Sequence, residues 1–260
     1  MGELVKVERR DTVGLAILNS PEASNSLDRD TAVALRDAFL ELFEDDNVRS
    51  LAVTGEGKAF CAGGDLRQMG KFSEMPVEEA LQWPSAIIDL HRMMLHAPKP
   101  VVAAVNGPAY AGGMGLAGMC DIIIATPEAR FALPEVRIGL FPMIIVAHLA
   151  RAIPRKLLQE MMFTGAPIDA DEAYRIGFVS KVFSDRQAML VGLDEYGKAF
   201  ARVSPQAIRL GREAFHLLSE LPAGLALDAA QFLNLPFFLG ADLREGTNAF
   251  FEKREPKWES

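Results

Sequence analysis

The chain has 260 residues, 50% of them hydrophobic and 24% charged, so it can bury a large core as an ordinary globular protein. Its net charge of -8 disfavours nucleic-acid binding, because phosphate backbones would be repelled. Cys61, Cys120 and four scattered histidines lack the spacing of a disulfide framework or a metal site, which favours a reducing, cytoplasmic location. No apolar run approaches the ~20 residues of a membrane span, so no membrane partner is expected.

The first predicted elements are a hairpin and a helix. Alternating residues over 4–8 and 13–18 predict two strands joined by a turn. Asp28 predicts the N-cap of a helix that runs to about Phe43, because apolar residues recur at helical spacing after it. A buried strand is expected over 50–54, followed by a glycine-bearing loop over 55–65.

Helices and short strands alternate further along the chain. Residues 76–96 have a helical period with a break at Pro84, and strands are expected over 101–105, 121–125 and 130–133. After about residue 142, helical periods dominate except at 178–182. The pattern predicts an α/β core over residues 1–200 and a helical region over 201–260.

Two glycine-rich loops each follow a predicted strand directly: GKAFCAGGDL at 57–66 and NGPAYAGGMG at 106–115. Glycine allows a ligand to approach the backbone, and helices starting near Gly64 and Gly112 would present unpaired N–H groups. Two such groups converging on one oxygen form an oxyanion hole. Either loop alone is more simply explained as a tight turn or close helix packing, and neither contains a phosphate-binding fingerprint.

Taken together and in order, five segments resemble the signatures of the enoyl-CoA hydratase/isomerase (crotonase) superfamily. They are GKAFCAGGDL, AAVNGPAYAGGMGLAGMCDIIIA, FALPEVRIGLFP, FTGAPIDADEAYRIGFVSKV and FFEKREPKW. The resemblance implies a crotonase-like α/β fold, a spiral of ββα units followed by a C-terminal helical region that trimerises. It also implies an acyl-CoA substrate, no separate cofactor because CoA arrives within the thioester, and a homotrimer or dimer of trimers.

The resemblance assigns roles to individual residues by their positions in these segments. The N–H groups of Gly64 and Gly112 would form the oxyanion hole, and Ala62 and Leu66 would line the adenine side of the CoA site. Lys253 matches a tail lysine that helps to hold the CoA nucleotide, often from a neighbouring subunit. A solvated charge in a charged tail explains Lys253 nearly as well.

The sequence departs from the hydratase pattern at half of the acid/base pair. Hydratases of the family use two glutamates, and here Gly115 stands at the first position while Glu135 holds the second. Certain diene isomerases of the family have an additional aspartate where this chain has Met143. Glu135 lies between apolar segments, and burial there would raise its pKa, which suits a proton shuttle, although a glutamate after proline is usually a surface charge.

One carboxylate suits removal of a proton beside the thioester and its return elsewhere on the same face. We therefore expect a Δ3,Δ2-enoyl-CoA isomerase of fatty-acid metabolism in which Glu135 is the base. The alternatives are a hydratase or dehydratase that uses Glu135 and water, a decarboxylase or thioesterase, and a CoA-thioester-binding protein with little catalysis. Residues 68–94 and 141–145 are expected to supply the acyl pocket, unless they are ordinary core.

Overall fold

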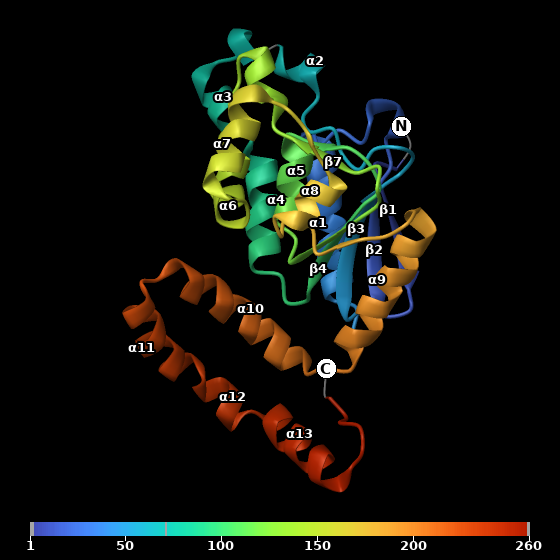
Figure 1. Ribbon diagram of the computed structural model, residues 1–260, viewed down its shortest axis with the longest axis vertical. Helices are drawn as coiled ribbons and strands as arrows, with labels where there is room; N and C mark the ends of the chain where they lie inside the picture. The colour runs from blue at the N-terminus through green and yellow to red at the C-terminus, as the bar shows by residue number, and fades with distance from the viewer. Residues whose placement is uncertain (1–2, 71, 259–260) are drawn as a thin grey trace.

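The computed structural model describes residues 3–70 and 72–258 (Figure 1). Its main sheet has six strands. They are, in order across the sheet, β1 (Val5–Arg10), β2 (Val13–Leu18), β3 (Ser50–Gly55), β4 (Val101–Val105), β6 (Ile122–Ala125) and β9 (Lys181–Val182). β1 and β2 form the predicted antiparallel hairpin, and the other pairs are parallel. Parallel strands are normally covered on both faces, and β2, β3 and β4 are buried along their whole length.

Alternating side chains divide the main sheet into two covered faces. Leu15 and Ile17 of β2 pack with residues of α9 (Arg186–Ala201) on one face. Ala16 and Leu18 belong to the main core on the other face, which α1 (Arg29–Phe43) and α4 (Ser85–Leu95) cover (Figure 1). The sheet is therefore a rigid platform for the loops that leave its strands.

The helix boundaries follow the signals expected from the sequence. The Asp28 carboxylate accepts a hydrogen bond from the Thr31 N–H at 2.9 Å, which confirms the predicted cap of α1. The helical segment predicted over 76–96 is divided at Pro84 into α3 (Val77–Gln82) and α4. Proline lacks a backbone donor, so the chain bends where the pattern predicted a break.

A second sheet of three short strands carries the loops: β5 (Ala109–Tyr110), β7 (Arg130–Ala132) and β8 (Ile168–Asp169). The sequence did not predict β8, and the strand expected over 178–182 is only the two residues of β9. Such short strands show no periodicity of their own. Around them lie α2 (Leu66–Met69), α5 (Gly112–Gly118), α6 (Met143–Ala152), α7 (Arg155–Thr164), α8 (Ala170–Arg175) and the 3-10 helices η1 (Pro21–Ala23), η2 (Phe72–Glu74) and η3 (Pro134–Ile138).

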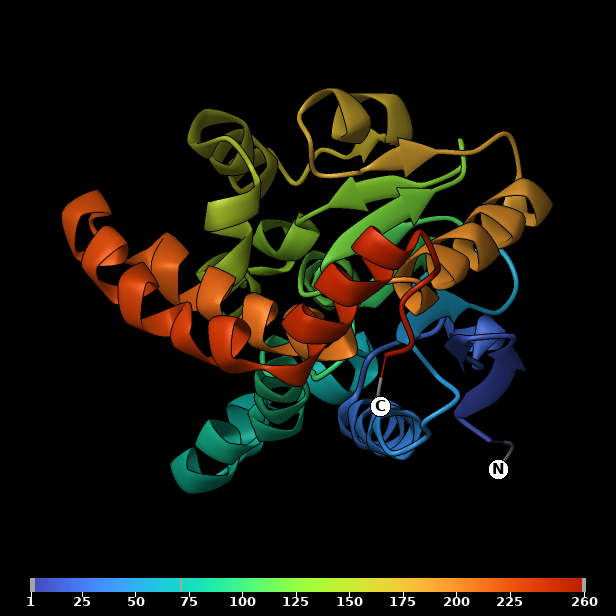
Figure 2. The same ribbon diagram turned by 90° about the horizontal axis from the view of Figure 1, so that it is seen from below.

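The last four helices form an arm that extends away from the core (Figures 1 and 2). They are α10 (Pro205–Glu220), α11 (Ala223–Leu233), α12 (Leu235–Leu239) and α13 (Ala241–Glu252). Within these helices Ala249 is the one buried residue. The division between residues 200 and 201 stays a prediction. No single described helix has the length and apolarity to cross a membrane, although the bent segment from α11 to α13 meets both criteria together.

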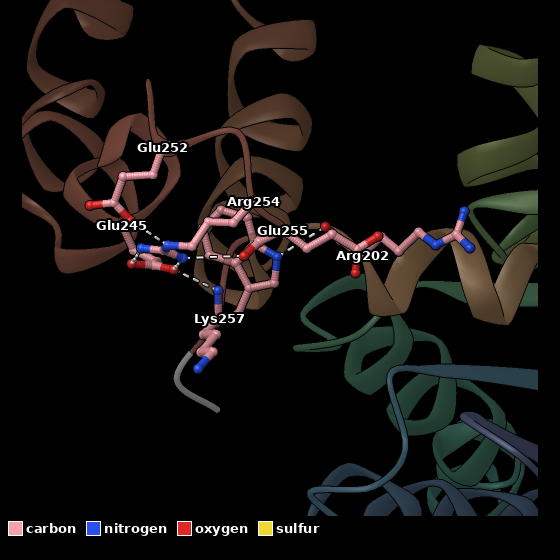
Figure 3. A network of polar contacts seen from close by, with 7 residues as sticks. Arg202, Glu245, Glu252, Arg254, Glu255 and Lys257 are labelled. Carbon is pink, nitrogen blue, oxygen red and sulfur yellow. Dashed lines mark hydrogen bonds and ion pairs between the residues drawn. The ribbon is translucent and has the colours of Figure 1, made fainter. Parts of the chain in front are cut away.

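Arg254, in the tail that follows α13, forms ion pairs with acidic side chains of this helix (Figure 3). Its guanidinium forms ion pairs with Glu245 and Glu252, each with a closest N–O distance of 2.6 Å. The Lys257 N–H also donates to Glu245, and these contacts, that of Arg254 first, lower the pKa of Glu245 to about 2. The Trp258 indole N–H donates to the Arg202 carbonyl at 2.9 Å, so the tail returns to the end of α9.

Candidate functional site

The two glycine loops lie side by side. The Tyr110 N–H donates to the Cys61 carbonyl at 2.9 Å, and the N–H groups of Phe60 and Cys61 point at the Pro108 carbonyl. A parallel bridge joins Cys61 to Ala109. Loops that are distant in the sequence thus meet backbone to backbone, next to the start of α5.

Two glycines permit this close approach. A Cβ added at Gly113 would overlap the carbonyl oxygen of Cys61. Gly63 has a φ of +85°, which side chains rarely tolerate, and a Cβ there would lie 2.7 Å from the Ala111 Cβ and 3.0 Å from the Gly112 nitrogen. The glycines are therefore required by the contact between the loops as well as by any ligand.

Two backbone donors are left free on these adjoining loops. Within residues 3–70 and 72–258, neither the Gly64 N–H nor the Gly112 N–H has a hydrogen-bond acceptor. Gly112 is the first residue of α5, and Ala111 before it has a φ of 50° and a ψ of -125°. Strained backbone of this kind persists where the surrounding structure enforces it, here through a bond of 2.9 Å from the Ala111 N–H to the Ala132 carbonyl.

Two buried asparagines hold the first loop, and neither was expected from the sequence to have this role. The Asn25 amide donates to the carbonyls of Glu56 and Ala59 at 2.9 and 2.8 Å. The Asn106 side chain accepts from the Gly55 N–H at 3.0 Å and donates to the Gly57 carbonyl at 3.1 Å. The position of Asn106 directly after a buried strand was a signal, whereas nothing in the local pattern marked Asn25.

Glu135 follows the strand β7, which is hydrogen-bonded to the second loop. It lies on η3, three residues after Ala132, whose carbonyl is bonded to the second loop. Its Oε2 atom is buried and has no hydrogen-bond partner among the described residues. Burial raises the pKa of Glu135 above its ordinary value. A raised pKa brings a carboxyl group closer to neutral pH, which suits proton transfer.

Apolar side chains surround the loops and η3. A Cβ added at Gly64 would overlap the terminal methyl of Met69, so this methionine from the expected acyl pocket lies against the first loop. Phe141 and Phe163 lie with ring centroids 6.5 Å apart, and Met143 is exposed at the start of α6. Apolar, adaptable side chains of this kind are what an acyl pocket requires, so the expectation of a pocket from these segments stays a prediction.

The structure places the remaining predicted residues in two different regions. Ala62 and Leu66 are exposed on either side of Gly64, so they accompany the first loop. Lys253 ends α13 with a φ of 56°, on the arm and far from α2 and α5 (Figure 1). Within one chain, the structure does not bring Lys253 to the glycine loops.

Other chemistry-bearing groups are sparse. Among the described residues, no three His, Cys, Asp or Glu side chains are grouped to hold a metal ion. Burial raises the pKa of the Cys61 thiol to about 12, so this side chain is not a thiolate at neutral pH. A groove of about 1420 Å³ lies between α4, α6 and α10, and Gly64, Gly112 and Glu135 do not line it.

Comparisons with known proteins agree with the expected fold. The model of the family described as enoyl-CoA hydratase/isomerase matches residues 8–260. The chain is 33% identical to the crotonyl-CoA hydratase of Syntrophomonas wolfei, over 97% of this chain and 96% of that protein. It is 34% identical to the mitochondrial enoyl-CoA hydratase domain-containing protein 3 of Rattus norvegicus, covering 98% and 84% of the two chains.

A solved structure of a related protein is similar to this chain in both sequence and fold. The enoyl-CoA hydratase of Mycobacterium smegmatis superposes with a TM-score of 0.91 at 32% identity, with 99% of both chains covered. These similarities confirm the crotonase-like α/β fold that the sequence segments implied.

The contact between the two loops predicts opposite effects for two Gly→Ala variants. Gly113→Ala should lower the free energy of unfolding by about 1–3 kcal/mol, because its Cβ overlaps the Cys61 carbonyl. Gly211→Ala is the control, because its Cβ meets nothing within 4 Å inside α10, and it should raise stability by up to about 1 kcal/mol. Urea unfolding measures both; equal effects of the two variants would contradict the close approach of the loops.

Proposed function

Because the chain belongs to the enoyl-CoA hydratase/isomerase family, we propose that it isomerises enoyl-CoA thioesters with Glu135 as the single acid/base group. The observation that carries this proposal is the buried carboxylate oxygen of Glu135, which has no partner among the described residues, in a chain that has Gly115 at the first acid position. Family membership supports an acyl-CoA enzyme, and the single carboxylate favours proton transfer within the substrate.

In this proposal the thioester oxygen accepts hydrogen bonds from the Gly64 and Gly112 N–H groups. Glu135 removes a proton from the α carbon of a 3-enoyl-CoA, and the electron pair moves into a dienolate whose negative oxygen lies in the oxyanion hole. Loss of one such donor costs about 3 kcal/mol of transition-state stabilisation in other enzymes. Glu135 then returns the proton to the γ carbon, which gives the 2-enoyl-CoA without a net change in mass.

Hydration is the second candidate, because the relatives named above are called hydratases. Water addition places a hydroxyl on the β carbon and a proton on the α carbon, and two acid/base groups divide that work well. Glu135 would have to do both with water alone. A third candidate, a CoA-thioester-binding protein with little catalysis, predicts that Glu135 is dispensable.

Replacement of Glu135 by glutamine separates these candidates. Glu135→Gln should lower kcat/KM for 3-enoyl-CoA isomerisation by about 100-fold or more, the usual scale of general-base catalysis, with little change in CoA-thioester affinity. Product masses report isomerisation or hydration. Glu128→Gln is the matched control, because Glu128 also follows a proline but is exposed, and it should keep full activity.

Water addition that depends on Glu135 would replace the isomerase assignment by a hydratase. Equal thioester binding by both proteins with no turnover of either substrate would favour the binding protein.

The pH dependence of isomerisation should reveal the buried carboxylate. Glu135 acts as a base only when ionised, so kcat/KM should fall as the pH is lowered through its pKa. Because burial raises that pKa, the fall should occur above the ordinary range of glutamate, about 4.3. A pH profile that stays flat down to that range would contradict the role of Glu135.

We further propose that the arm assembles the protein into a homotrimer or a dimer of trimers. Large apolar side chains on the arm are exposed in one chain, including Leu239 at 81% and Phe250 at 78%. Their burial against a second copy is the ordinary fate of so large an apolar surface. A neighbouring copy would then bring Lys253 to the CoA nucleotide beside Ala62 and Leu66.

Light scattering after size-exclusion chromatography tests the assembly. The mass should be three or six times the 28.4 kDa of one chain, and Leu239→Glu/Phe250→Glu should reduce it. Val77→Glu/Leu81→Glu is the control, because these side chains are as exposed on α3, at the other end of the molecule (Figure 1). A wild-type mass of one chain would contradict the proposal.

A further inference from the structure

Gly115 lies one turn along α5 from Gly112, whose N–H is a proposed oxyanion donor. Residues three apart on a helix share a face, and each Cα–Cβ bond tilts toward the helix N-terminus. A side chain at position 115 would therefore extend toward the end of α5 at which the thioester oxygen is expected. This position is the natural place for a second acid/base group in the site.

Ile145 of α6 occupies that place. A Cβ added at Gly115 would overlap the Ile145 Cγ2 atom and would lie 2.8 Å from its Cβ. Ile145 is 4% exposed, so it cannot turn away without repacking the core. The absence of a side chain at position 115 is therefore built into the contact between the two helices.

Two further contacts fix this arrangement. A Cβ added at Gly118, the next turn of α5, would lie 2.6 Å from the Leu149 Cδ2 atom. The His148 Nε2 atom lies 3.0 Å from the Gly115 carbonyl, which can only accept, so this nitrogen carries the proton and donates. α6 thus contacts α5 through Ile145, His148 and Leu149, and its register against the glycines is set at both Gly115 and Gly118.

The geometry points to Ile145 as a specificity-determining residue that takes the place of a second acid/base group beside Gly112 and keeps water from that side of the site. Glu135 then remains as the group that moves protons, and proton transfer within the substrate is favoured over water addition. This inference rests on the proposed isomerase function. According to this inference, the buried side chain of Ile145 determines whether the site favours isomerisation or hydration.

The test places a glutamate at position 115 and removes most of the Ile145 side chain that would block it. Gly115→Glu/Ile145→Ala should add water to 2-enoyl-CoA at least tenfold faster than the wild type, as seen by the mass gain of the product. Gly115→Glu alone should unfold at a lower temperature than the double variant and should show no such gain. Gly118→Glu/Leu149→Ala is the matched control, because it makes the same exchange one turn farther from Gly112.

Ile145→Glu gives a second route if the double variant does not fold, because it brings a carboxylate to the same place from α6. Leu149→Glu is its control. The inference is overturned if folded variants at 115 or 145 add water no faster than the wild type, or if the controls gain as much. Isomerisation by the wild type tests the proposed isomerase function by itself. Failure of that function can therefore be distinguished from failure of the role inferred for Ile145.

Discussion

The site depends on the direct contact between the backbones of two loops. The bond from Tyr110 to Cys61, with Gly113 against the same carbonyl, places the start of α5 beside the loop that contains Gly64. A Cβ at Gly63 would lie 3.0 Å from the Gly112 nitrogen, so the loops are in close contact next to the Gly64 and Gly112 N–H groups, which have no acceptor among the described residues. Buried asparagines and a parallel sheet hold the loops in place, so we expect the Gly64 and Gly112 N–H groups to be positioned before a substrate binds.

The same close packing is the structural basis of the proposed single-carboxylate site. The Oε2 atom of Glu135 on η3 is buried and has no partner among the described residues, and burial raises the pKa of this carboxyl group, which favours its protonated form. In the proposed mechanism this group is the base. On the other side, Ile145 closes the space over Gly115. The His91 ring lies with its centroid 5.2 Å from that of His148, which contacts the Gly115 carbonyl. Burial lowers the pKa of His91 to about 3 and also lowers that of His148, so both rings are neutral at neutral pH.

Much of this arrangement was predictable from the sequence, for physical reasons that differ by element. Asp28 and the spacing after it defined α1, and glycines after two apolar strands marked the loops. The two-residue strands β5 and β8 have no period to detect, and the pairing of β5 with β7 is a tertiary contact. Gly115 was visible as a missing acid, but only the packing of α6 explains why glycine is required there. The roles of individual residues came from family resemblance.

A crystal structure with a non-reacting enoyl-CoA thioester analogue tests the central claim most directly. We predict that the thioester oxygen lies about 3 Å from the nitrogens of both Gly64 and Gly112. The Glu135 carboxylate should face the α and γ carbons, and Ile145 should fill the space beside Gly115 on the same side of α5 as the thioester oxygen. A thioester bound in the groove between α4, α6 and α10, or an acyl chain out of reach of Glu135, would contradict the account.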